Sequence, residues 1–98
     1  MLHTVNKSPF QNSSLENCLR VAQQGDVILL LEDGVYAASM GTAKSSLIEQ
    51  AVKRHTVVYA IDADLKARGL ANLIKEVRVA SYGDFVDLVE QHPIHAWL

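Results

Sequence analysis

Residues 25–38 read Gly-Asp-Val-Ile-Leu-Leu-Leu-Glu-Asp-Gly-Val-Tyr-Ala-Ala, and this stretch decides the fold. Its apolar run, Val27 to Leu31, is too short for an amphipathic helix and lies between a Gly-Asp turn and a Glu-Asp-Gly turn. Such a run is typical of a strand that is buried on both faces of a parallel sheet, so we interpret it as the central strand. Because ligands and partners of such sheets gather beyond the carboxyl ends of the strands, Glu32 to Ala38 is the first place to look for function.

Strands and helices are predicted to alternate along the rest of the chain. Apolar runs bounded by turns predict strands at residues 2–5, 57–61 and 77–80, and an edge strand or an oligomer contact at 94–98. Apolar residues at helical spacing predict helices from residue 13 toward Gly25, at 43–53 and at 81–91, with shorter helical pieces at 35–40, 62–68 and 70–75. Two capping boxes, Ser13 with Glu16 and Ser81 with Asp84, mark helix starts. The last helix is expected to bury Phe85, Leu88 and Val89.

This alternation determines the predicted fold class. Strands joined through helices of this length imply right-handed crossovers between parallel strands. We therefore expect a small doubly wound α/β domain, with a mainly parallel sheet of four to five strands and helices on both faces. Ninety-eight residues suffice for one such domain, spanning residues 1–98.

The composition excludes several classes of function. With 49% hydrophobic and 20% charged residues, the chain is apolar for its length, which suggests that part of its surface meets another subunit. A formal net charge of -2 argues against direct binding of nucleic acid. No apolar segment approaches the roughly 20 residues that span a bilayer, and the first residues do not resemble a signal peptide. We expect a cytoplasmic protein without a membrane segment.

Four polar clusters follow the predicted strands and should meet at the carboxyl edge of the sheet. They are Asn6-Lys7, Glu32-Asp33, Asp62 with Asp64, and Ser81-Tyr82. Their carboxylates could bind Mg²⁺ or the rim could accept a phosphorylated partner. The competing interpretation is that each cluster is a turn or a helix cap, and we assign no metal site. The five glycines match neither the dinucleotide fingerprint nor the P-loop, so no cofactor is predicted.

Cys18 is the only cysteine, and it lies on the apolar stripe of the first predicted helix together with Leu15, Leu19 and Ala22. A reactive thiolate is favoured by exposure and by a helix N-terminus or a nearby cation, none of which this position offers. The pattern therefore favours a buried core thiol, with a persulfide carrier or exchange thiol as the alternative. His3, inside the first strand, is expected to be packed and hydrogen-bonded.

Several segments together resemble one known family. They are Met1–Thr4, Lys7–Phe10, Leu29–Ala38, Asp64–Leu70, Asp84–Leu88 and the final Ala96-Trp97. In this order they cover essentially the whole chain and resemble the TusB/DsrH family of sulfur-relay proteins.

The resemblance implies a subunit of a TusBCD-type or DsrEFH-type complex, a dimer of heterotrimers. Its sister subunits would be TusC/DsrF-like and TusD/DsrE-like chains, and the TusD/DsrE-like chain holds the recognised sulfur-carrying cysteine. The complex passes persulfide sulfur to a TusE/DsrC-like carrier. In the Tus branch the sulfur ends in 2-thiouridine at the tRNA wobble position, whereas the Dsr branch serves dissimilatory sulfur oxidation.

Within this family the chain is expected to be mainly a structural partner, and whether it is itself an enzyme stays open. Cys18 is the one candidate thiol. We expect the partner interface to include rim and aromatic residues, because aromatic side chains are enriched at such interfaces. These residues are Glu32, Asp33, Val35, Tyr36 and Trp97. The third alternative is a standalone domain that binds a small ligand or Mg²⁺ at the Glu32-Asp33 rim.

Overall fold

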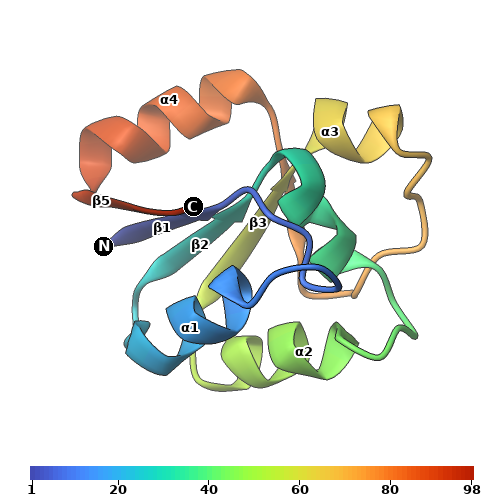
Figure 1. The fold of residues 1–98 in the computed structure, drawn as a ribbon. Coiled ribbons are helices and arrows are strands. Elements are labelled where there is room, and N and C mark those ends of the chain that lie inside the picture. Colours follow the sequence, from blue (N-terminus) through green and yellow to red (C-terminus); the bar gives the residue numbers. More distant parts are fainter.

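Five short strands form one sheet in which every neighbouring pair is parallel, in the order β4-β3-β2-β1-β5 (Figure 1). The computed structural model describes all of residues 1–98. The strands are β1 (Leu2–Val5), β2 (Val27–Leu30), β3 (Val57–Ile61), β4 (Arg78–Ala80) and β5 (Ile94–Trp97). The helices are α1 (Ser14–Val21), the 3-10 helix η1 (Glu32–Ala38), α2 (Ser45–Lys53), α3 (Asp62–Ala67) and α4 (Tyr82–Gln91). The predicted α/β class with a parallel sheet is confirmed.

The predicted central strand is confirmed as β2, which lies between β1 and β3 in the middle of the sheet. All four of its residues are buried, as a strand covered on both faces requires. The tail, predicted to be an edge strand or an oligomer contact, is the edge strand β5, paired to β1 from Ile94 to Trp97. None of the helices is long and apolar enough to cross a membrane.

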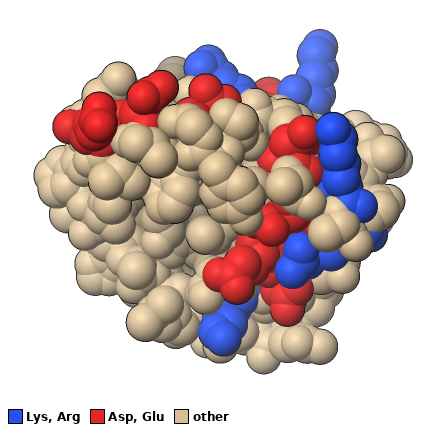
Figure 2. All heavy atoms as spheres, turned by 90° about the horizontal axis from the view of Figure 1, so that it is seen from above, with Lys and Arg blue, Asp and Glu red and all other residues tan.

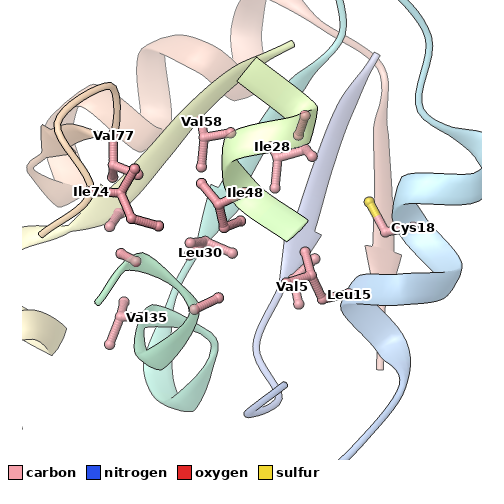
Figure 3. Close-up of a cluster of buried hydrophobic side chains, with 14 of the residues drawn as sticks. Val5, Leu15, Cys18, Ile28, Leu30, Val35, Ile48, Val58, Ile74 and Val77 are labelled. Atoms are coloured by element: carbon pink, nitrogen blue, oxygen red, sulfur yellow. The ribbon is translucent and has the colours of Figure 1, made fainter. Parts of the chain in front are cut away.

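The two faces of the sheet carry hydrophobic clusters of unequal size. The larger cluster has 15 buried residues and lies under α1, α2, η1 and α3 (Figure 3). It includes Val5, Leu15, Ile28, Leu30, Ile48, Val58 and Leu65. The cluster on the other face has five buried residues, namely Leu2, Val27, Leu29, Ile61 and Ala80. Most of the burial that stabilises the chain is therefore on one side of the sheet.

Helix α4 covers the smaller cluster incompletely. Phe85 and Leu88 pack against that cluster, as predicted, but both are only half-buried. The prediction for Val89 was wrong, because its side chain is 38% exposed, and no residue of α4 is buried. A ten-residue helix without a buried residue leaves apolar surface open in the isolated chain.

The structure corrects two local predictions. Ser13 forms no capping hydrogen bond, and the side chain of the preceding residue, Asn12 Oδ1, accepts the Ser14 N–H at 2.7 Å. Residues 70–75 form no helical turns. They run extended beside the end of η1, where Asn72 accepts from Met40 N–H and Ile74 N–H donates to Ala38, at 2.9 and 2.8 Å. The second capping box is confirmed, with Asp84 N–H donating to Ser81 Oγ at 3.0 Å and Ser81 N–H to Asp84 Oδ2 at 2.9 Å.

Gly34 lies directly against the end of β1. A Cβ placed on Gly34 would sit 2.0 Å from the carbonyl oxygen of Val5 and 2.9 Å from its carbonyl carbon. The same Val5 oxygen accepts the N–H of Leu31 at 3.1 Å, so it cannot move away without breaking that bond. Only glycine therefore allows η1 to approach β1 this closely.

We predict that Gly34→Ala destabilises the chain by about 3 kcal/mol or more, because the new methyl group overlaps the backbone of β1. Chemical denaturation followed by circular dichroism measures the loss. Gly83→Ala is the matched control. Gly83 lies in α4, and a Cβ placed on it would meet nothing closer than Ser81 Oγ at 3.5 Å. The control should leave the stability unchanged or raise it by about 0.5–1 kcal/mol. Equal effects of the two substitutions would contradict the close approach.

Candidate functional site

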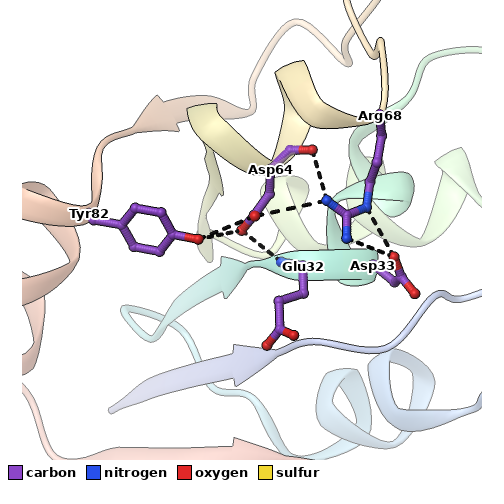
Figure 4. Close-up of polar contacts among 5 residues, drawn as sticks. All are labelled: Glu32, Asp33, Asp64, Arg68 and Tyr82. Carbon is purple, nitrogen blue, oxygen red and sulfur yellow. Dashed lines mark hydrogen bonds and ion pairs between the residues drawn. The ribbon is translucent and has the colours of Figure 1, made fainter.

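Three of the four polar clusters predicted to meet at the carboxyl edge of the sheet do meet, around Asp64 (Figure 4). Asp64 Oδ2 accepts the backbone N–H of Glu32 at 2.8 Å and the hydroxyl of Tyr82 at 3.1 Å. Arg68 reaches from α3 to Asp33, with its Nε 3.0 Å and its Nη2 2.9 Å from Asp33 Oδ1. Arg68 Nη1 also donates to the backbone oxygen of Asp64 at 3.1 Å. We call Glu32, Asp33, Asp64, Arg68 and Tyr82 the rim cluster.

Four predicted members lie outside these contacts, namely Asn6, Lys7, Asp62 and Ser81, of which Ser81 caps α4. Asp62 pairs on the surface with Lys66, one helical turn away, at 3.0 Å. Asn6 follows β1, and its side-chain oxygen is buried without a hydrogen-bond partner. The rim cluster therefore connects η1, α3 and the start of α4, but not β1.

The charges of the rim cluster are largely satisfied within it. The hydrogen bond and charge of Asp33 raise the pKa of Arg68, aided by the charge of Asp64. Partial burial, together with the hydrogen bond to Asp64, raises the pKa of Tyr82. No group of three or more His, Cys, Asp or Glu side chains is placed to hold a metal ion. The carboxylates of Asp33 and Asp64 are engaged by Arg68 and Tyr82, which favours the interpretation as a structural junction.

Glu32 is the exception in this cluster. Its carboxylate is exposed and makes no hydrogen bond or ion pair, while its backbone has a φ of 49°. Residues other than glycine rarely adopt this conformation, so the N–H bond to Asp64 helps to hold it there. The free carboxylate at the end of the central strand is available to another molecule.

Cys18 is completely buried, and Figure 3 shows its sulfur directed from α1 toward the strands. The predicted core position is thus confirmed. Burial, and then the negative charge of Asp26, raise the pKa of the thiol to about 12. The thiolate is the nucleophilic form of cysteine, so the burial of Cys18 disfavours its reactive form.

A second polar network joins β1 to β5 and to the loop before β2. His3 was predicted to be packed and hydrogen-bonded, and it is 1% exposed with partners on both ring nitrogens. The indole N–H of Trp97 donates to His3 Nδ1 at 3.1 Å, and His3 Nε2 lies 2.9 Å from Asp26 Oδ2. Since indole nitrogen is only a donor, Nδ1 must accept, which places the ring proton on Nε2 facing Asp26. This chain of contacts joins β5 to β1 and to the loop before β2.

Asp26 also binds the start of the chain. Its carboxylate accepts the Gln23 N–H at 3.0 Å and pairs with the Met1 amine at 3.2 Å. Burial alone would raise the pKa of Asp26. The bonds from Gln23, His3 and the amine lower it instead, to about 2.

Comparison with known proteins identifies the family. The family described as "DsrH like protein" matches residues 7–94. Protein TusB of Pectobacterium atrosepticum is 37% identical over 94 residues, which is 95% of both chains. Protein TusB of Escherichia coli (strain K12 / DH10B) is 39% identical over 99 residues, covering 99% of this chain and 100% of that one. The chain belongs to the DsrH-like family, which includes TusB.

Solved structures show that the fold is shared more widely. The YchN protein of E. coli superposes with a TM-score of 0.85 over 97% of both chains, at 18% identity. Protein MTH1491 of Methanobacterium thermoautotrophicum gives a TM-score of 0.76 over 97% of this chain and 96% of that one, at 14% identity. At these identities the likeness shows the fold alone.

The residues expected to contact a partner differ in how exposed they are. Val35 is 0% exposed and belongs to the larger hydrophobic cluster, so its assignment to a partner contact was wrong. Glu32 and Asp33 are exposed, and Tyr36 is half-buried with the Arg68 guanidinium 6.0 Å from its ring centre. Trp97 is half-buried and engaged with His3.

Two residues of these networks were missed by the sequence reasoning. Arg68 lies four positions after Asp64 on a helix, a spacing at which opposite charges pair, and this signal could have been used. Asp26 offered no such signal, because its partners His3 and Met1 come from another strand.

We predict that Asp64→Asn in this DsrH-like chain lowers the pKa of Tyr82 toward its ordinary value of 10.0, because the negative acceptor that stabilises the neutral phenol is lost. NMR titration of labelled tyrosine rings measures the shift. Asp62→Asn is the control, since Asp62 lies on the same helix and pairs with Lys66. An unchanged Tyr82 titration in Asp64→Asn would contradict the contact.

We predict that part of the chain's stability disappears on acidification because of Asp26. Its folded pKa, about 2, lies below its ordinary 3.8, so its contribution is present above about pH 4 and is lost as the pH falls through 2. The difference between these two pKa values corresponds to about 2 kcal/mol of unfolding free energy. Denaturation at pH values from 6 to 2 measures this loss, and the free energy of unfolding should fall less steeply with pH for Asp26→Asn than for the wild type. Asp87→Asn, at an exposed residue of α4, should keep the wild-type slope. An equal dependence of the unfolding free energy on pH in Asp26→Asn and wild type would contradict the role given to Asp26.

Proposed function

We propose that this chain is a TusB-like structural subunit of a sulfur-relay complex that supports formation of 2-thiouridine at the tRNA wobble position. The observation that carries the proposal is the burial of Cys18, the chain's only thiol, in a member of this family. Transfer of persulfide sulfur requires a thiolate that can reach a second sulfur atom. A thiol that is 0% exposed, with a pKa of about 12, meets neither condition.

The sulfur-carrying cysteine would then belong to a sister chain. We propose TusC/DsrF-like and TusD/DsrE-like partners in a dimer of heterotrimers, which delivers sulfur to a TusE/DsrC-like carrier. The cytoplasm, where thiols stay reduced, is the proposed compartment. With a net charge of -2, the chain itself would not bind the tRNA.

The surface over α4 supports assembly with other subunits. Tyr82, Val86 and Val89 are 49%, 56% and 38% exposed, and their spacing places them along one side of the helix. Figure 2 shows a broad area without charged residues on the α4 half of this face, while charges gather on the α3 half and along one margin. Such a surface favours burial against another subunit. Next to it, Glu32 and Asp33 remain candidate contacts.

Affinity purification of the chain from its native host tests the proposal. Co-elution of two sister chains, and loss of tRNA 2-thiolation when the gene is deleted, are the expected results. Intact thiolation with a defect in sulfur oxidation would assign the chain to the DsrEFH-type pathway instead. A monomer stabilised by Mg²⁺ would overturn the proposal in favour of a standalone domain.

We predict that Cys18→Ala leaves sulfur transfer by the co-expressed complex unchanged, because the thiol carries no sulfur. The substitution should lower stability by about 1–2 kcal/mol through the cavity it leaves. Mass spectrometry of the trapped complex should find persulfide on a sister chain. Loss of transfer in a complex that still assembles, or persulfide on Cys18 during turnover, would overturn the structural role.

In the isolated chain, iodoacetamide should label Cys18 only as fast as the protein unfolds. Labelling that is fast and independent of added denaturant would show an accessible thiol.

A further inference from the structure

A groove of about 240 Å³ opens between α1 and α2, which pack side by side on the face of the sheet opposite α4 (Figure 1). Its apolar lining comes from both helices and comprises Leu19, Ala22, Leu47 and Ala51. Leu19 and Leu47 are half-buried at the edge of the larger hydrophobic cluster, so the floor of the groove is continuous with the core.

The groove carries positive charge that the chain does not neutralise. Arg20 and Arg54 line it from the ends of α1 and α2, and the guanidinium group of neither forms a hydrogen bond or an ion pair. The acidic residue of the lining, Glu16, is already paired with Lys44 at 3.2 Å. Thr56, 5% exposed, also borders the groove and makes no side-chain hydrogen bond. An apolar floor is thus combined with two free guanidinium groups.

These properties select the kind of occupant. Binding sites for small organic ligands usually measure roughly 300–1,000 Å³, so this groove suits one or two side chains better than a cofactor. Guanidinium groups bind carboxylates through paired hydrogen bonds, and an apolar floor favours an aliphatic side chain. We propose that the groove docks an acidic segment of a partner protein. One apolar side chain of that segment lies between α1 and α2, and its flanking carboxylates bind Arg20 and Arg54.

This docking surface is distinct from both surfaces described above. Helix α4 and the rim cluster lie elsewhere on the chain, so a subunit packed against α4 leaves the groove open. The inference therefore does not depend on the identity of the sister subunits.

Fluorescence anisotropy with a labelled peptide, Glu-Leu-Asp-Leu-Glu with blocked ends, tests the proposal on the co-purified complex and on the full chain. The wild type should bind the peptide saturably. Arg20→Gln and Arg54→Gln should each weaken binding about two- to fivefold, and the double substitution about tenfold, because each exposed charge pair contributes modestly. Circular dichroism confirms that these surface variants keep their fold.

Three controls separate specific docking from charge attraction. Arg78→Gln removes another exposed arginine, on β4, and should leave binding unchanged. A peptide with Gln and Asn in place of its acids, and one with Ser in place of its leucines, should each bind at least tenfold more weakly. Equal binding of any of these peptides, or an equal effect of Arg78→Gln, would overturn the proposal. So would full displacement of the peptide by acetate, which would indicate a small-anion site, or the absence of binding at millimolar concentration.

Discussion

The contact between Gly34 and the Val5 carbonyl sets the geometry of the carboxyl edge of the sheet. Because a Cβ at residue 34 would lie 2.0 Å from that oxygen, η1 can fold back over β1 only with glycine at this position. At the start of this fold-back Glu32 has a left-handed backbone conformation, and Asp33 lies within reach of Arg68. The central strand is thereby connected to α3, and through Asp64 to α4.

Parallel sheets usually bind ligands at their carboxyl edge, but in this chain two of the acidic side chains of that edge are engaged with other residues of the chain. Asp33 and Asp64 are engaged by Arg68 and Tyr82, and Cys18 lies in the core rather than at the edge. The carboxyl edge therefore joins elements of the chain and presents one free carboxylate, Glu32.

Sequence alone could predict the elements that depend on local pattern. Unbroken apolar runs indicated β2 and β3, and the helical spacing of Cys18 indicated its burial, because period and length alone decide these cases. The Ser81 capping box formed as predicted, whereas Ser13 forms no capping bond and Asn12 accepts the Ser14 N–H instead. Two predictions about the exposure of single side chains, those for Val35 and Val89, failed.

These failures share one physical cause. Whether a side chain is exposed depends on how the helices pack on the sheet, which local sequence patterns do not specify. Val35 is buried because η1 folds onto β1, and Val89 is exposed because nothing in this chain packs outside α4. The contact between His3 and Trp97 joins residues 94 positions apart, and no local signal indicates it.

The two faces of the sheet differ in how much apolar surface the chain itself buries, and this difference bears on both stability and assembly. Fifteen buried residues lie on the side of α1 and α2, and five on the side of α4, so the chain folds around the first side. Burying α4 against another subunit adds apolar contacts that the isolated chain lacks, and this stabilises the subunit by mass action. The groove between α1 and α2 rests instead on the larger cluster, which is already complete within the chain. A partner that binds there meets a preformed surface and does not have to order the subunit first, which lowers the entropic cost of binding.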